Sequence, residues 1–174
     1  HSVIRDNSAI IEEEADRLTT LVEDLLTASK IQAEREVKLN LADVRLEPVA
    51  ARSVERLEGQ SKHRIVLSFP DNFPIIQGDE ARLRQAIDNL LTNAIKYSPS
   101  SKTITVGGRF TDSHITLFVR DEGEGIPSDQ IDKIFDRFYR IDDKLTRKTQ
   151  GTGLGLYLVK AIVEAHQGEI SVKS

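Results

Sequence analysis

The chain has 174 residues, of which 39% are hydrophobic and 30% charged, and its 24 basic and 28 acidic side chains give a formal net charge of −4. This balance is typical of a globular domain, and it fits neither a disordered chain nor a membrane-spanning helix of ~20 consecutive apolar residues. The chain has no cysteine, which excludes disulfides, thiolate zinc sites and cysteine nucleophiles, and its mild acidity argues against general binding to nucleic acids.

Residues 3–31 are predicted to form one long helix, because they contain neither glycine nor proline and their apolar residues recur at helical spacing. A helix of this length cannot bury an apolar face alone, so it should need a second helix or a partner chain. The alternative is that it packs on its own domain. The apolar stripe comprises Ile4, Ile11, Leu18 and Leu25, widened by Leu21, Val22, Leu26 and Ala28.

The next segment alternates between polar and apolar stretches. Residues 32–46 are expected to form a polar linker with a short strand. A helix is predicted from about Glu47 to near Gly59, where glycine is a common terminator. Alternating apolar residues then predict strands over His63–Phe69 and Phe73–Gln77.

Asp79 is a good N-cap for the following helix, which should run to Lys96. Strands are predicted over Thr103–Val106 and Ile115–Arg120, forming a hairpin. Because helices and strands do not alternate strictly, we expect an antiparallel or mixed sheet covered by helices on one face. The remaining predicted elements are a short helix over Ser128–Phe135, a last helix with Leu158, Val159, Ile162 and Val163 that ends at Gly168, and the start of a strand over Glu169–Val172.

The long helix after Asp79 carries a polar edge. Asn89, Asn93 and Lys96 are four and three residues apart, so they share one helix face, opposite the leucines. Two amide oxygens and an ammonium group suit a hydrated Mg²⁺ ion and phosphates. A solvated polar face is the alternative, but two asparagines in the middle of a helix are unfavourable in propensity.

A glycine-rich turn follows the second strand of the hairpin, in the sequence Asp121-Glu122-Gly123-Glu124-Gly125-Ile126-Pro127. Its two glycines permit positive φ and a close approach of the backbone to a planar ligand. Asp121 leaves the end of a strand as an acceptor for an exocyclic amine. An acidic tight turn is the alternative, since the pattern alone is weak.

A second glycine-rich turn, Gly151-Thr152-Gly153-Leu154-Gly155-Leu156, leads into the last helix. Alternate glycines expose backbone N–H groups at a helix N-terminus, which favours phosphate. The turn has neither Walker A nor Rossmann spacing. The alternative is an ordinary loop at the start of a helix.

An aromatic and basic segment lies between the two glycine-rich turns. We expect Phe135 and Phe138 to anchor one side of it, while Tyr139 and Arg140 face a ligand. This composition is typical of a mobile lid over a triphosphate, and an exposed loop is the alternative. The segment continues through Lys144, Arg147 and Lys148.

Taken in this order, these segments resemble the catalytic ATP-binding region of two-component sensor histidine kinases, within the wider family that includes Hsp90, gyrase B and MutL. In this comparison RLRQAIDNLLTNAIKYS resembles the N box, DEGEGIP the G1 box, IFDRFYR the F box and GTGLGL the G2 box. Upstream, EADRLTTLVEDLLTASK resembles the second helix of the dimerisation and phosphotransfer domain, so the resemblance covers essentially the whole chain.

The resemblance implies an α+β fold of the Bergerat type. This is a two-layer α/β sandwich with a mixed, mainly antiparallel sheet covered by helices on one face, preceded by one long dimerisation helix. It divides the chain into a truncated dimerisation helix (residues 1–34), a linker with the first short strand (35–46) and the catalytic ATP-binding domain (47–174).

The same resemblance assigns roles to individual residues. Asn93 and Asn89 are expected to hold Mg²⁺, and Lys96 and Arg140 to contact the phosphates of ATP. Asp121 is expected to pair with the adenine amine. The other implied ATP-binding positions are Tyr97 and Tyr139, which line the pocket, and Gly123, Gly125, Ile126, Gly151, Thr152, Gly153, Leu154, Gly155 and Leu156.

The resemblance also implies the reaction. The intact protein would be a homodimer through its first helix, would transfer the γ-phosphate of ATP to its own histidine, and would then pass it to an aspartate of a response-regulator receiver domain. The family's phosphoacceptor precedes Glu or Asp and then Arg-Thr-Pro, a context that none of His1, His63, His114 and His166 has. We therefore expect a cytoplasmic fragment cut at both ends, with sensor domains and any membrane anchor upstream, no membrane contact of its own, and no histidine in catalysis or metal binding.

Two alternatives stay open. The first is an ATP-hydrolysing enzyme of the Hsp90 or MutL type. Those relatives have a glutamate that activates water where this chain has Asn89, and an amide cannot take a proton at neutral pH. The second is a non-catalytic dimerisation module that merely keeps the fold, which the intact glycine turns and Lys96 oppose.

Overall fold

The computed structural model describes residues 37–59, 61–141 and 151–174, together with separate positions of the first predicted helix: Ala15, Leu18, Thr19, Val22, Leu25, Leu26 and Ser29. These separate positions are all α-helical, and the Thr19 hydroxyl donates a hydrogen bond to the Ala15 carbonyl at 2.9 Å. The other predicted positions of that helix, including Ile4, Ile11, Leu21 and Ala28, lie outside the described residues, as do Lys144, Arg147 and Lys148. The chain divides into two compact units, His1–Val37 and Lys38–Ser174. Within the described positions, no helix combines the length and the apolar character that crossing a membrane requires.

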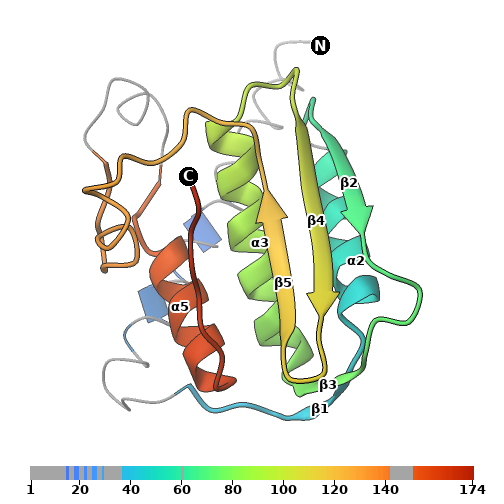
Figure 1. The fold of residues 1–174 in the computed structure, drawn as a ribbon. Helices are drawn as coiled ribbons and strands as arrows, with labels where there is room; N and C mark the ends of the chain where they lie inside the picture. The colour runs from blue at the N-terminus through green and yellow to red at the C-terminus, as the bar shows by residue number, and fades with distance from the viewer. Residues whose placement is uncertain are drawn as a thin grey trace, which may run out of the picture. The chain divides into compact units, whose positions relative to one another are not determined.

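The second unit contains a sheet with helices on one face. β2 pairs in parallel with β4, and β4 pairs antiparallel with β5, while β1 and β3 form a separate antiparallel pair. Helices α2 and α3 lie against one face of the three-stranded sheet, and α5 packs beside α3 (Figure 1). The predicted mixed sheet with helices on one face is thereby confirmed. In chain order the elements are β1 (Ala42–Val44), α2 (Leu46–Glu58), β2 (Arg64–Ser68), β3 (Ile76–Gly78), α3 (Glu80–Tyr97), β4 (Thr103–Phe110), β5 (Ile115–Arg120) and α5 (Gly155–Ala165).

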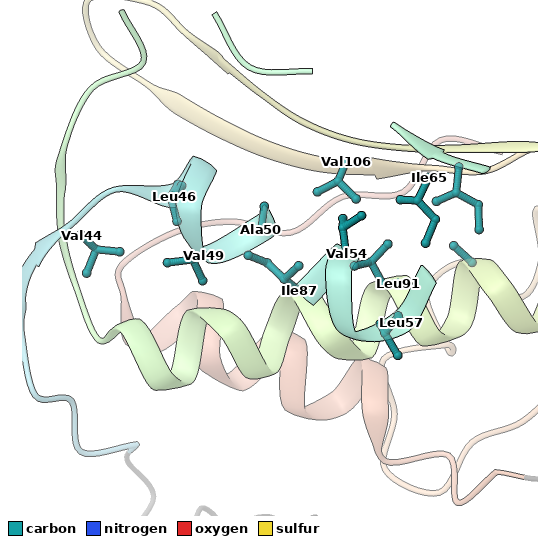
Figure 2. Packing of buried hydrophobic residues seen from close by; sticks show 12 residues of the cluster. Val44, Leu46, Val49, Ala50, Val54, Leu57, Ile65, Ile87, Leu91 and Val106 are labelled. Carbon is teal, nitrogen blue, oxygen red and sulfur yellow. The ribbon is translucent and has the colours of Figure 1, made fainter. Parts of the chain in front are cut away.

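The main hydrophobic core lies between the sheet and helices α2 and α3 (Figure 2). Ile87 and Leu91 of α3 are fully buried there, and burial of such a side chain contributes about 1.5–3 kcal/mol of transfer free energy. The core therefore fixes which face of α3 points inwards and leaves the edge with Asn89, Asn93 and Lys96 only partly buried. The cluster comprises Val44, Leu46, Val49, Ala50, Val54, Leu57, Ile65, Ile87, Leu91, Ala94, Ile104 and Val106.

Helix α3 begins as the sequence predicts. Asp79 is its N-cap, and the backbone N–H of Arg82 donates to Asp79 Oδ1 at 3.0 Å. The backbone N–H of Asn40 donates to the other carboxylate oxygen at 2.9 Å. Burial raises the pKa of Asp79, but these N–H groups and the Arg82 guanidinium outweigh it, so that the pKa lies below its ordinary value.

This lowered pKa predicts how stability depends on pH. A carboxyl group whose pKa is lower in the folded chain stabilises it above the unfolded pKa of about 3.9, and loses this effect as the pH falls through the folded value. Asp79→Asn should therefore lower the free energy of unfolding by about 1–2 kcal/mol at neutral pH, because the charged acceptor is lost. In urea titrations the difference from the parent chain should stay constant down to about pH 5 and shrink below about pH 4.

Asp71→Asn, in an exposed turn, is the matched control and should change the free energy of unfolding by less than about 0.5 kcal/mol. A difference between the parent and Asp79→Asn that grows on acidification would contradict the assigned direction of the pKa.

The predicted hairpin is present, but its first strand is longer than expected. β4 continues through Gly107 and Gly108, which were expected to leave the strand before the turn. The two glycines make room for close neighbours. A Cβ atom at Gly107 would lie 2.4 Å from the Ser68 carbonyl oxygen and 2.6 Å from the ring of Phe118, and one at Gly108 would lie 2.3 Å from the ring of Phe73. Here glycine marks close packing inside a strand rather than a turn.

Three other expectations are wrong. Residues 128–135 form successive turns rather than a helix, because most of their hydrogen bonds join residues three apart, such as Lys133 N–H to the Gln130 carbonyl at 2.9 Å. The last helix ends at Ala165, and the residue with positive φ that follows it is Gln167, at 60°, rather than Gly168, whose N–H donates back to the Val163 carbonyl at 2.9 Å. Residues 169–172 do not form a strand. In addition, β3 begins at Ile76, later than predicted, because Pro74 has no N–H to donate to a ladder.

Candidate functional site

The polar edge of α3 is positioned by the burial of its opposite face. The side-chain amide of Asn89 donates to the Gln85 carbonyl one turn earlier at 3.1 Å, which leaves its Oδ1 available as an acceptor. Asn93 has no side-chain hydrogen bond to any described residue. Both side chains are partly buried. Amide oxygens are ligands that Mg²⁺ accepts, and within the described ranges no cluster of three or more His, Cys, Asp or Glu offers a competing metal site.

The start of helix α5 faces this edge. A Cβ atom at Gly155 would lie only 3.0 Å from Asn89 Oδ1, so the glycine allows the amide and the helix N-terminus to meet. The N-cap residue of α5 is Leu154, whose side chain is buried and makes no capping hydrogen bond. The first N–H groups of α5 therefore have no side-chain cap, which is the arrangement that binds phosphate at a helix N-terminus.

Two cationic side chains meet at Gly151. A Cβ atom at Gly151 would lie 2.6 Å from Lys96 Nζ, which brings the end of α3 to the second glycine-rich turn. Arg140 Nη1 donates to the Gly151 carbonyl at 3.1 Å. The negative charge of a polyphosphate would be stabilised between these two positively charged side chains.

The first glycine-rich turn lies against the C-terminal end of α3. Gly123 N–H donates to Asp121 Oδ1 at 2.7 Å, and a Cβ atom at Gly123 would lie 2.7 Å from the carbonyl oxygen of Tyr97. Figure 1 shows this turn following β5 at the same end of the domain. The Asp121 carboxylate is exposed, so its second oxygen can accept a hydrogen bond from a ligand.

The turn after Asp121 has a partner that the sequence does not reveal. Gly125 has a φ of 77°, and the next N–H, that of Ile126, donates to Ser174 Oγ at 2.5 Å. No pattern in the sequence points to Ser174, because the contact arises only from the path of the chain after α5.

The aromatic segment contacts the second glycine-rich turn through its backbone. Phe138 has a φ of 63°, and its N–H donates to the Gly153 carbonyl at 3.0 Å. Gly153 itself has a φ of 72°, and a Cβ atom there would lie 2.7 Å from the Phe138 carbonyl carbon and from the Tyr139 carbonyl oxygen. A side chain at position 153 would therefore push the two segments apart.

The side chains of this segment are arranged differently from the expectation. Phe138 was predicted to anchor the segment, but it is 54% exposed, with the Arg137 guanidinium over its ring at 4.7 Å. Ile134 is the buried residue instead. The Tyr139 hydroxyl donates to Gln130 Oε1, a partner that sequence reasoning missed.

The structure thus brings together most of the predicted site residues. Asn89, Lys96, Arg140 and the second glycine-rich turn lie together, and the Asp121 turn adjoins the end of α3 at Tyr97. The parts that all the predicted site residues play in ligand binding stay predictions.

Comparisons with known proteins find relatives of this chain. The family model described as "Histidine kinase-, DNA gyrase B-, and HSP90-like ATPase" matches residues 78–174. The chain is 34% identical to the sensor histidine kinase WalK of Bacillus subtilis (strain 168) over 165 residues, which is 92% of this chain and 27% of that protein. It is 36% identical to the sensor protein kinase WalK of Staphylococcus aureus over 169 residues, which is 95% of this chain and 40% of that protein.

A solved structure shows the same fold. The full-length ShkA crystal structure in complex with AMPPNP superposes with a TM-score of 0.82 at 28% identity, covering 98% of this chain and 35% of that one. The chain therefore spans well under half the length of these relatives.

Proposed function

The chain belongs to the family of histidine kinase-, DNA gyrase B- and HSP90-like ATPases, and we propose that it binds Mg-ATP and presents the γ-phosphate to a histidine outside its ATP-binding domain. The chain contains the catalytic ATP-binding domain of a sensor histidine kinase, with kinase homology along almost its whole length. For the domain limits we propose residues 47–174, after a linker over residues 35–46 and a dimerisation helix over residues 1–34.

One observation carries the proposed nucleotide site. Lys96 and Arg140 both reach Gly151, and Asn89 reaches Gly155, at the N-terminus of a helix without a side-chain cap. Two cations and a helix N-terminus suit a triphosphate. We propose that Asn89 and Asn93 hold Mg²⁺ through their amide oxygens, where the bound ion would neutralise phosphate charge.

The same residues favour phosphoryl transfer over hydrolysis. A hydrolase needs a general base beside the γ-phosphate, and the Asn89 amide cannot accept a proton at neutral pH. We therefore propose that bound ATP is kept for an incoming histidine. A steady-state phosphate-release assay tests this point: slow release despite saturated binding supports the kinase, and rapid turnover supports an ATPase.

The partners follow from the same proposal. Leu18, Val22, Leu25 and Leu26 are between 46% and 60% exposed, so the helix that carries them has an apolar stripe for a second copy of the chain. We propose a homodimer through this helix in the intact kinase, a response-regulator receiver domain as the acceptor of the phosphoryl group, and a cytoplasmic location. Sedimentation velocity of the chain tests the dimer.

The preference for the adenine or the guanine nucleotide tests the proposed role of Asp121. Asp121→Asn should weaken ATP binding about tenfold or more, because a hydrogen bond to a charged acceptor contributes about 1.5–3 kcal/mol. The variant should also lose its preference for ATP over GTP, since an amide can donate where the carboxylate only accepts. Calorimetric titrations of both nucleotides measure the two effects.

The turn itself should survive this substitution, because Asn can still accept the Gly123 N–H that Asp121 Oδ1 accepts. Asp112→Asn, in the exposed turn of the hairpin, is the matched control and should leave both affinities unchanged. Equal binding of ATP and GTP by the parent chain would show that Asp121 does not select the base.

A further inference from the structure

Both ring nitrogens of His166 form hydrogen bonds with backbone groups. His166 Nδ1 lies 2.7 Å from the Ile162 carbonyl oxygen, and Nε2 lies 3.0 Å from the backbone nitrogen of Asp79. A carbonyl can only accept and an N–H can only donate. The hydrogen-bond partners therefore make Nδ1 the donor and Nε2 the acceptor.

The partner of His166 is a junction of three segments. Asp79 is 6% exposed, accepts the N–H of Asn40 on one carboxylate oxygen and that of Arg82 on the other, and gives its own N–H to His166. Asn40 lies just after the boundary between the two units of the chain. Asp79 therefore connects the segment that precedes β1, the start of α3 and the end of α5.

The His166 ring fits closely against the backbone before α3. A Cβ atom at Gly78 would lie 3.5 Å from His166 Cδ2 and Nε2, and 2.7 Å from Leu83 Cδ1. Glycine at this position makes room for the Leu83 side chain, and the ring lies at ordinary van der Waals distance from the same point. We call the Asp79–His166 contact, with its neighbours Asn40 and Gly78, the clasp.

The clasp and the nucleotide site lie at opposite ends of the same helix pair. Asp79 precedes α3 and His166 follows α5, while Asn89, farther along α3, meets Gly155 at the start of α5. The helices are therefore antiparallel along this contact (Figure 1). At 1.5 Å per residue, both the segment from Asp79 to Asn89 and the segment from Gly155 to His166 span roughly 15 Å, so the two contacts match in spacing.

Between these two contacts the helices meet through apolar side chains. Ala86 of α3 packs with Val159 and Ile162 of α5, with Leu90 and Val163 at the edge of the cluster. Apolar contacts are not directional, so they define the position of one helix along the other less sharply than hydrogen bonds do. The hydrogen bonds at the clasp are directional, and they set where α5 sits along α3.

From this geometry we propose that His166 and Asp79 are positioning residues for the nucleotide site. By holding the end of α5 to the start of α3, they place Gly155 against Asn89 and Gly151 against Lys96. The inference rests on the proposed ATP site, but the position of α5 along α3 can be measured without nucleotide.

The experiment compares substitutions of His166 in the whole chain. His166→Leu removes the acceptor for the Asp79 N–H, whereas His166→Gln keeps an acceptor oxygen within reach. In the nucleotide-free protein, the amide resonances of Gly151, Gly153 and Gly155 should move in His166→Leu and stay near their parent positions in His166→Gln. The affinity for AMPPNP with Mg²⁺ should fall about tenfold in His166→Leu and less than threefold in His166→Gln.

His114→Leu, in the exposed hairpin turn, is the control and should change neither the glycine resonances nor the affinity. If His166→Leu does not fold, His166→Lys serves in its place, because an ammonium group cannot accept from the Asp79 N–H. Unmoved glycine resonances in the variant that lacks the acceptor would overturn the proposal, and so would an equal loss in His166→Gln. Failure of the parent chain to bind AMPPNP would refute the proposed function, while the resonances still test the clasp.

Discussion

Gly153→Ala should lower the affinity for Mg-ATP roughly 10- to 100-fold, because an alanine there is held at a φ that L-residues rarely adopt, at a cost of about 1–3 kcal/mol. The added Cβ would also lie 2.7 Å from backbone atoms of Phe138 and Tyr139. Relief of this overlap moves the segment that carries Arg140 away from the turn that should hold the phosphates. Isothermal titration calorimetry with Mg-ATP measures the loss.

Gly59→Ala is the matched control for this substitution. Gly59 has a φ of −64°, and a Cβ atom there would meet no atom closer than the Glu55 carbonyl oxygen at 4.0 Å. Its affinity for Mg-ATP should equal that of the parent chain. Parent-like binding by Gly153→Ala would show that the contact between the two segments has no part in holding the nucleotide.

Asn93→Ala should remove most of the Mg²⁺ dependence of ATP binding. The substitution deletes one of the two amide oxygens proposed as protein ligands of the ion, and alanine favours a helix, so α3 should keep its structure. We expect the affinity measured with Mg²⁺ to fall tenfold or more and to approach the affinity measured with EDTA, since interactions with charged groups contribute about 1.5–3 kcal/mol each.

Thr92→Ala tests whether any change on α3 has this effect. Thr92 is the preceding residue, is exposed and projects from a different face of the helix. It should bind Mg-ATP like the parent chain. The assignment of the metal ligands is contradicted if Asn93→Ala keeps the full ratio between affinities with and without Mg²⁺.

The sequence predicts best the elements whose pattern is local. The glycine signal at Gly59 placed the end of α2, and periodic apolar residues placed α3, each within about one residue of the observed limits. Asp79 was identified as a cap because its carboxylate acts on N–H groups of the next turn. Gly107 and Gly108 were misread because their small size makes room for other segments, the Ser68 carbonyl and the Phe118 ring at Gly107 and the Phe73 ring at Gly108. Such a contact has no signature at the glycine itself.

In the candidate site, too, local motifs could be predicted and contacts between distant segments could not. Each motif could be located from its residues, but the pairings of Lys96 with Gly151 and of Asn89 with Gly155 depend on how α5 packs beside α3. The acceptors that complete the site, Gln130 for the Tyr139 hydroxyl and Ser174 for the Ile126 N–H, come from segments without a motif. They could not be predicted, because hydrogen bonds between distant segments follow from the fold rather than from local sequence.

The location of the nucleotide is the central claim, and amide chemical-shift mapping with Mg-AMPPNP tests it most directly. An open cavity of about 630 Å³ at the opposite end of the sheet is the alternative nucleotide site. It is lined by Ser68, Phe69, Pro70, Gly108, Arg109, Phe110 and Phe118. We expect the largest shifts at Gly123, Gly151, Gly153 and Gly155, with resonances of the cavity residues unchanged. Shifts confined to the cavity around Arg109, or none at all at saturating nucleotide, would contradict the account.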